Sequence, residues 1–191
     1  MPGHTLLALI YAQLRQNERA DAHFRQALSL SESQRLATTD LRNSYAWYLC
    51  QTDRMTQGLN ELSQVLRDPL YGSLDKALVN ASVCAARLGQ NGMAETYINA
   101  ALAMRPDFGL AYLYRGHLLV NQAQFKAAQA DWQTAQQLLG EAPETLWLLA
   151  RIERHAATGR SLHTGAAERL QKRFPVSQEA NWLRAAQWQW F

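Results

Sequence analysis

Apolar residues recur along this chain at spacings of three and four positions, which is the period of helices that bury one face. The pattern predicts eleven helices, over about 3–15, 19–31, 36–52, 55–67, 72–88, 91–104, 108–121, 124–138, 143–157, 161–173 and 177–189. The five prolines all fall just before a predicted helix or at its first residue, where a missing N–H is tolerated. We therefore predict an all-α chain without a domain linker.

A longer pattern of small and large residues repeats within these helices every 34 to 38 residues. It is clearest in the first and fourth occurrences, at Leu7, Ala8, Tyr11, Ala20, Phe24 and Ala27, and at Tyr112, Gly116, Leu119, Ala128, Trp132 and Ala135. The small residues let two antiparallel helices approach closely, while the large ones fill the space beside them.

This order is typical of tetratricopeptide repeats. We therefore expect an all-α, right-handed superhelix that forms one array over residues 1–191. The expected helix-turn-helix units cover about 1–34, 39–72, 75–108, 109–142 and 143–176, followed by a C-terminal capping helix over 177–191.

Composition and motifs exclude several other functions. The 191 residues carry a net charge of +3, which is too small and too dispersed for a nucleic-acid footprint. No apolar run approaches the ~18 residues of a membrane span. The sequence has no His-Glu-x-x-His motif, no Gly-x-Ser-x-Gly motif and no glycine-rich phosphate loop. We therefore expect a protein that is not an enzyme and that uses no cofactor, metal or small-molecule substrate.

Binding to another protein is the function that remains. In stacked helix pairs the first helices line a concave surface, and an apolar groove there marks a partner site. The positions that face this surface predict a groove formed by Asn43, Trp47, Val83, Arg87, Leu113, His117 and Ile152. We expect the apolar members to supply contact area and the polar ones to set the register by hydrogen bonds. The alternative for each residue is packing between neighbouring helices.

Several stretches resemble one family, the tetratricopeptide lipoproteins of type IV pilus biogenesis known as PilF or PilW. The similar stretches are Asn43–Cys50 (NSYAWYLC), Asp68–Tyr71 (DPLY), Asn80–Gln90, Ala101–Phe108 and Leu170–Glu179. The resemblance implies a pilotin-like scaffold on the periplasmic face of the outer membrane, which helps the pilus secretin to localise and assemble or stabilises pili. No lipobox cysteine precedes Gly3, so the implied lipid anchor is not among these residues. The alternative is a soluble cytoplasmic scaffold that binds a peptide segment in an unrelated complex.

The two cysteines fall on the first helices of the second and third repeat units, which should be neighbours. A disulfide between Cys50 and Cys84 would be allowed in the periplasm and would contribute on the order of 3 kcal/mol to stability in the chain-entropy model. Two buried thiols at a close helix contact are the other alternative. The spacing leaves both open.

Three aromatic residues, Trp188, Trp190 and Phe191, stand among the last four positions. We expect them to pack on the capping helix or to stay without fixed structure, with a second adhesive surface as the alternative.

Overall fold

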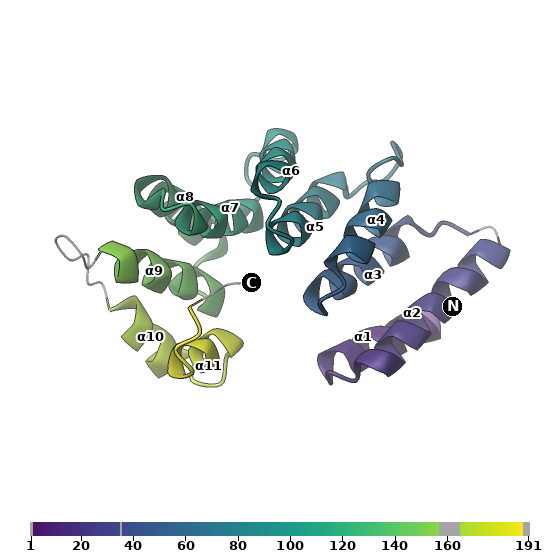
Figure 1. Cartoon of the computed structure of the whole chain (residues 1–191), viewed down its shortest axis with the longest axis horizontal. Coiled ribbons are helices and arrows are strands. Elements are labelled where there is room, and N and C mark those ends of the chain that lie inside the picture. Colours follow the sequence, from purple (N-terminus) through teal and green to yellow (C-terminus); the bar gives the residue numbers. More distant parts are fainter. Residues whose placement is uncertain (1, 35, 157–164, 189–191) are drawn as a thin grey trace. The chain divides into compact units, whose positions relative to one another are not determined.

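The computed structural model describes residues 2–34, 36–156 and 165–188, which form α-helices joined by turns (Figure 1). The helices are α1 (Pro2–Gln13), α2 (Asn17–Ser33), α3 (Thr39–Gln51), α4 (Met55–Val65), α5 (Leu74–Arg87), α6 (Asn91–Met104), α7 (Gly109–Asn121), α8 (Phe125–Leu139), α9 (Pro143–Ala156), α10 (Ala166–Arg173) and α11 (Gln178–Arg184). No strand occurs in these described ranges. The predicted all-α fold is confirmed.

Two helix bounds differ from the predictions near the C-terminus. The predicted helix over 161–173 begins in residues that lie outside the described ranges, and α10 is described from Ala166. The predicted helix over 177–189 ends early, because Ala186 adopts a positive φ of 52°. Gln187 N then donates to Trp182 O at 2.8 Å, which closes the end of α11 with a backbone hydrogen bond.

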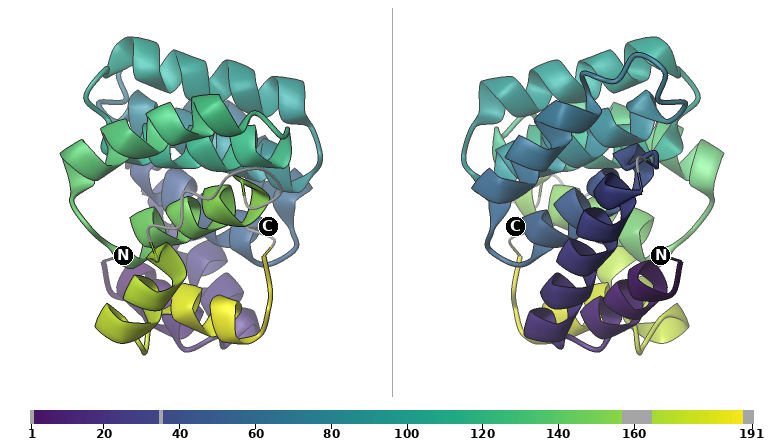
Figure 2. Two further views of the ribbon diagram at one scale, coloured as in Figure 1. Left: turned by 90° about the vertical axis from the view of Figure 1, so that its left-hand side faces the viewer. Right: turned by 90° about the vertical axis from the view of Figure 1, so that its right-hand side faces the viewer.

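Consecutive helices pack as antiparallel pairs, such as α1 with α2 and α7 with α8 (Figure 1 and Figure 2). The small residues of the repeat lie at these contacts: Ala8, Ala20 and Ala27 are fully buried around the Phe24 ring. A Cβ atom on Gly116 would lie 2.6 Å from Leu148 Cδ2, so a larger residue there would require the Leu148 side chain to shift. The spacing of small residues therefore acts through close helix packing, as the repeat pattern predicts.

The chain divides into two compact halves, residues 1–97 and 98–191. The core of the N-terminal half includes a cluster around Phe24, Tyr45 and Tyr48 and another around Leu62 and the two cysteines. The C-terminal half has its own clusters, one of which contains Leu113 and Ile152 and the other Trp147. Each half thus buries apolar side chains of its own.

The turn inside each of the first four helix pairs has the same backbone geometry. Its residue with positive φ is Arg15 (56°), Asp53 (56°), Gly89 (72°) and Ala123 (59°) in the four successive pairs. At each turn the following amide reaches back to the preceding helix, as when Gln124 N donates to Leu119 O at 2.8 Å. The repeat is therefore present in the backbone even where the residue type varies.

Candidate protein-binding surface

Four of the predicted groove residues belong to the N-terminal half. Asn43 and Trp47 lie one turn apart on α3 and are partly exposed, and Arg87 is partly exposed at the end of α5. Val83, one turn before Arg87, is buried. The accessible part of this predicted surface is therefore Asn43, Trp47 and Arg87.

Hydrogen bonds hold the polar members of this surface in place. Asn43 Nδ2 donates to the Tyr71 hydroxyl at 3.3 Å, and Asn43 Oδ1 accepts from Asn80 Nδ2 at 3.0 Å. Burial and the Asp40 carboxylate raise the pKa of Tyr71 to about 12, so its hydroxyl keeps its proton at neutral pH. Arg87 Nη2 lies 3.5 Å from Asp53 Oδ1, a carboxylate that is almost fully exposed. A bound segment could replace this weak partner with little loss.

The three predicted groove residues of the C-terminal half, Leu113, His117 and Ile152, are buried. Leu113 on α7 and Ile152 on α9 share one apolar cluster, because these successive first helices pack against each other. Val83 is buried as well, so these four side chains pack between helices, which was the alternative expected for each groove residue. Their direct contact with a partner stays a prediction.

His117 belongs to a buried polar network that the sequence pattern did not predict. Arg151 Nη1 lies 2.7 Å from His117 Nδ1, and Arg151 Nη2 donates to Asn121 Oδ1 at 2.6 Å. Arg151 Nε donates to Trp188 O at 3.1 Å. His117 and Arg151 are separated by 34 residues, so they occupy the same position in successive repeat units. This shared position in the repeat was the sequence signal from which their contact could have been predicted.

The protonation states in this network follow from burial and charge. Burial, reinforced by the Arg151 charge, lowers the pKa of His117 well below its ordinary value of 6.5. Since a guanidinium has no acceptor, the neutral His117 ring accepts at Nδ1 and carries its proton on Nε2. Burial also lowers the pKa of Arg151, to about 10, which leaves it charged at neutral pH.

The aromatic tail is described only in part. Trp188 stacks on Trp147 with ring centroids 5.3 Å apart, and Arg154 lies over the Trp188 ring at 4.5 Å. Trp188 therefore packs on the C-terminal half. Trp190 and Phe191 lie outside the described residues.

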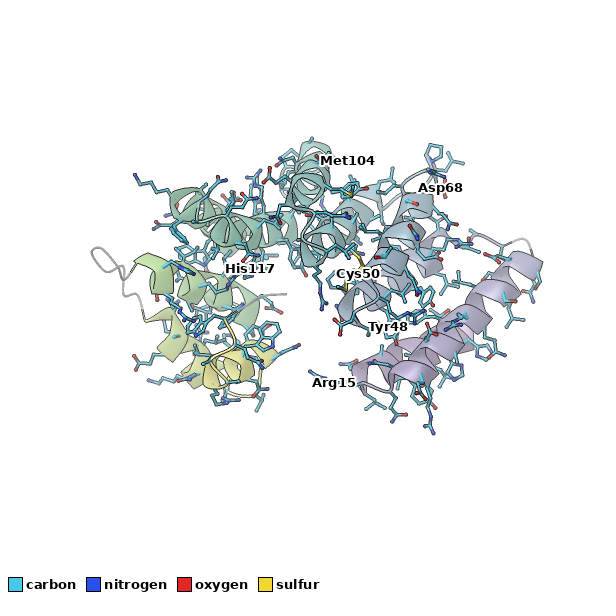
Figure 3. All side chains as sticks on the ribbon, in the orientation of Figure 1. Arg15, Tyr48, Cys50, Asp68, Met104 and His117 are labelled. Atoms are coloured by element: carbon cyan, nitrogen blue, oxygen red, sulfur yellow. A yellow bond between two sulfur atoms is a disulfide. The ribbon has the colours of Figure 1, made fainter. Side chains whose placement is uncertain are left out.

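Cys50 on α3 and Cys84 on α5 are joined by a disulfide with Cα atoms 5.2 Å apart (Figure 3). Both residues are fully buried beside Gly58 on α4. A Cβ atom at position 58 would lie 2.6 Å from Cys50 Sγ, so the glycine makes room for the bridge. Of the two arrangements that the sequence leaves open, the structure has the bridged one.

An exposed apolar row on α1 and the first residue of the turn after it was not predicted as a surface. Leu6, Leu9, Ile10 and Leu14 all expose more than two fifths of their area. Their spacing places them along one side of the helix. A contiguous apolar row of this kind is typical of a surface that contacts another protein.

The described residues contain neither a candidate membrane-spanning helix nor a candidate metal site. No described helix combines the length and the apolar character needed to cross a bilayer. Within the same ranges, no three His, Cys, Asp or Glu side chains gather where they could hold a metal ion.

Comparisons with known proteins find tetratricopeptide repeats in two parts of the chain. A family model for the tetratricopeptide repeat matches residues 2–34 and 75–108, which coincide with the first and third predicted units. No curated protein sequence matches the chain.

Solved structures are similar over nearly the whole chain. The structure of PilW, a widely conserved type IV pilus biogenesis factor, is 27% identical with a TM-score of 0.77, over 96% of this chain and 80% of PilW. That of PilF from Pseudomonas aeruginosa is 20% identical with a TM-score of 0.67, over 96% of this chain and 80% of that one. YrrB, a tetratricopeptide protein with an unusual peptide-binding site, is 13% identical with a TM-score of 0.57, over 95% of this chain and 90% of YrrB. The last two show the fold alone.

Residues 2–34 and 75–108 therefore match the tetratricopeptide repeat, and the similarity to PilW confirms the predicted resemblance to the tetratricopeptide proteins of type IV pilus biogenesis.

Proposed function

We propose that this chain is a non-catalytic, protein-binding scaffold of type IV pilus biogenesis, which assists secretin localisation and assembly or pilus stability. The observation that carries the proposal is the similarity to PilW, a pilus biogenesis factor, along 96% of the chain. Tetratricopeptide arrays present side chains from successive first helices to a bound segment, so the fold suits this role.

The contact surface of this proposal lies on the N-terminal half. Trp47 supplies apolar area, while Asn43 and Arg87 supply hydrogen bonds and charge. The exposed row on α1 adds further apolar area. Tryptophan and arginine are among the residue types that most often dominate binding energy at protein interfaces.

The disulfide supports a periplasmic location for the proposed scaffold. Bridges of this kind form and persist in oxidising compartments and are rare in the cytosol. Cys50 and Cys84 are bridged here, which favours the periplasmic face of the outer membrane over the cytoplasmic alternative. Under this proposal, attachment to the membrane would depend on a lipid anchor outside the described residues.

A pull-down from a native envelope extract tests the proposal, with this chain as bait and a Trp47→Ala, Arg87→Glu double variant beside it. Lys126→Glu, a charge reversal at an exposed position on α8, is the matched control. We expect the original chain and the control to retain a pilus secretin or another pilus protein, and the double variant to retain at least fivefold less. Equal retention by the double variant would reject this surface, and retention of no pilus protein by any bait would reject the pilus role.

A further inference from the structure

A cavity of about 330 Å³ opens on the C-terminal half, between α7, α9 and the segment after α11. Its lining residues are Val120, Asn121, Arg151, Arg154, His155 and Trp188. Arg151 is only 5% exposed, whereas Arg154 is exposed and stacks on the Trp188 ring. The cavity therefore joins two guanidinium groups to apolar walls from Val120 and Trp188.

The charge of Arg151 has no counter-ion among the described residues. Its three hydrogen-bond partners are a neutral imidazole, a side-chain amide and a backbone carbonyl. Arg154 likewise forms no ion pair within those ranges, and its guanidinium lies over the Trp188 ring. Burial of a charge without a counter-ion is unfavourable, so an anion at this place would be stabilised.

Other arginines of the chain show the contrast. Arg115 Nε and Nη2 each donate to an Asp131 carboxylate oxygen at 2.7 Å, and Arg54 donates to Asp21 at 2.5 Å. Arg42 donates to Glu61 at 2.6 Å. These partly buried arginines all have a carboxylate partner, whereas the more deeply buried Arg151 has none in the described part of the chain.

The donors of Arg151 also leave room for a ligand. A guanidinium carries five N–H groups, and three of those on Arg151 are used by His117, Asn121 and Trp188. Two N–H groups, one on Nη1 and one on Nη2, therefore have no partner among the described residues, and Arg151 lines the cavity. A planar carboxylate is the ligand that this donor geometry suits, and a neighbouring apolar side chain would contact Val120 and Trp188.

We propose that this cavity binds a peptide carboxylate next to an apolar residue, with Arg151 and Arg154 as its cationic partners. The site lies on different residues from the surface proposed above. It rests on the proposed function only in that a protein segment brings the carboxylate. Two sources share this chemistry, the free C-terminus of a partner and the side chain of an internal Asp or Glu.

Calorimetric titration of the full chain with three short probes tests the proposal. The first probe is N-acetyl-Ala-Ala-Phe with a free carboxylate, and the second is the same peptide with a C-terminal amide. The third, N-acetyl-Ala-Glu-Phe-Ala with a C-terminal amide, presents an internal carboxylate. We expect at least one carboxylate probe to bind tenfold or more tightly than the amide, and the stronger of the two identifies the source.

Three variants distinguish binding at this cavity from a general attraction between the probe and the positive charge of the chain. Arg154→Gln should weaken the binding of the carboxylate probe at least fivefold without unfolding the chain, because Arg154 is exposed. Lys172→Gln makes the same charge change at an exposed position on α10 and should leave binding unchanged. Arg151→Lys keeps the charge but loses the planar fork, and we expect an intermediate loss.

Three results would overturn the proposal: equal binding of amide and carboxylate probes, binding of none, or equal effects of Arg154→Gln and Lys172→Gln. The envelope pull-down stands apart from this titration. If the pull-down retains pilus proteins and the peptides fail, only the carboxylate site is rejected. If peptides bind and no pilus protein is retained, only the pilus role is rejected.

Discussion

The Asp21 side chain connects the first two helix pairs of the N-terminal half. Its carboxylate accepts from the Tyr45 hydroxyl at 2.6 Å and from Arg54 Nη1 at 2.5 Å, and it also pairs with Arg25 on its own helix. Burial alone would raise the pKa of this carboxyl, but the hydrogen bonds from Tyr45, Arg25 and Arg54 outweigh it and lower the pKa below 3.8. The charged form of Asp21 is thus the one that the fold stabilises.

Replacing Asp21 with Asn should lower the free energy of unfolding by roughly 1.5–3 kcal/mol at pH 7, because hydrogen bonds to a charged group are lost. A lowered pKa in the folded state contributes stability above the ordinary value and loses it as the pH falls through the folded value. The original chain should therefore lose stability below about pH 4 more steeply than Asp21→Asn. Urea unfolding between pH 2.5 and 7 measures both effects. Asp107→Asn, at an exposed position, is the control, and parallel pH curves for the chain and Asp21→Asn would contradict this account.

At the scale of the helix pair, the recurring turn requires one residue with a left-handed backbone conformation, whichever side chain that residue carries. Gly89 occupies it without strain, whereas Ala123, Asp53 and Arg15 have a Cβ atom in the same conformation. For such residues this conformation is unfavourable by roughly 1–2 kcal/mol. A Cβ atom added to Gly89 would meet no atom within 4 Å, so this cost is one of backbone conformation alone.

These turns predict opposite effects for a matched pair of substitutions. Ala123→Gly should raise the free energy of unfolding by about 0.5–1 kcal/mol, because relief of the strained φ exceeds the added entropy of glycine in the unfolded chain. Gly89→Ala should lower it by about 1 kcal/mol. Urea midpoints at constant m-value measure both changes, and a shift in the same direction for the two variants would refute the explanation.

At the scale of the whole molecule, the disulfide lies in one half of the chain only. It links α3 to α5 across a sequence separation of 34 residues, within residues 1–97. Closing a loop of that length contributes on the order of 3 kcal/mol by restricting the unfolded chain. The two halves should therefore respond differently to reduction.

Reduction of the bridge should speed hydrogen exchange of the amides in α3, α4 and α5 by about a hundredfold, and should change α7 to α9 much less. The expected factor corresponds to the stability that a disulfide of this loop length contributes. Hydrogen exchange with mass spectrometry, before and after a reductant, resolves the two halves. A Cys50→Ala, Cys84→Ala variant serves as the control for the reductant itself. Equal acceleration in both halves would argue against a local role for the bridge.

Local spacing determined most of what could be predicted. The period of apolar residues and the repeated alanines specify the helices and their close pairing, because both depend on residues only a few positions apart. The resemblance to the pilus biogenesis proteins rests on the same local stretches, such as Asn43–Cys50. The helix bounds were therefore close, apart from the end of α11, where a left-handed alanine carries no sequence signal.

Packing between repeat units decided the rest, since burial depends on neighbours some 34 residues away. Only the folded chain shows that Val83, Leu113 and Ile152 are buried while Trp47 stays accessible. The bond between Cys50 and Cys84 depends in the same way on how α3 meets α5. Arg151, unremarkable in the sequence, meets His117 because the two helices place equivalent positions side by side, and that juxtaposition creates a buried cation with no carboxylate partner among the described residues.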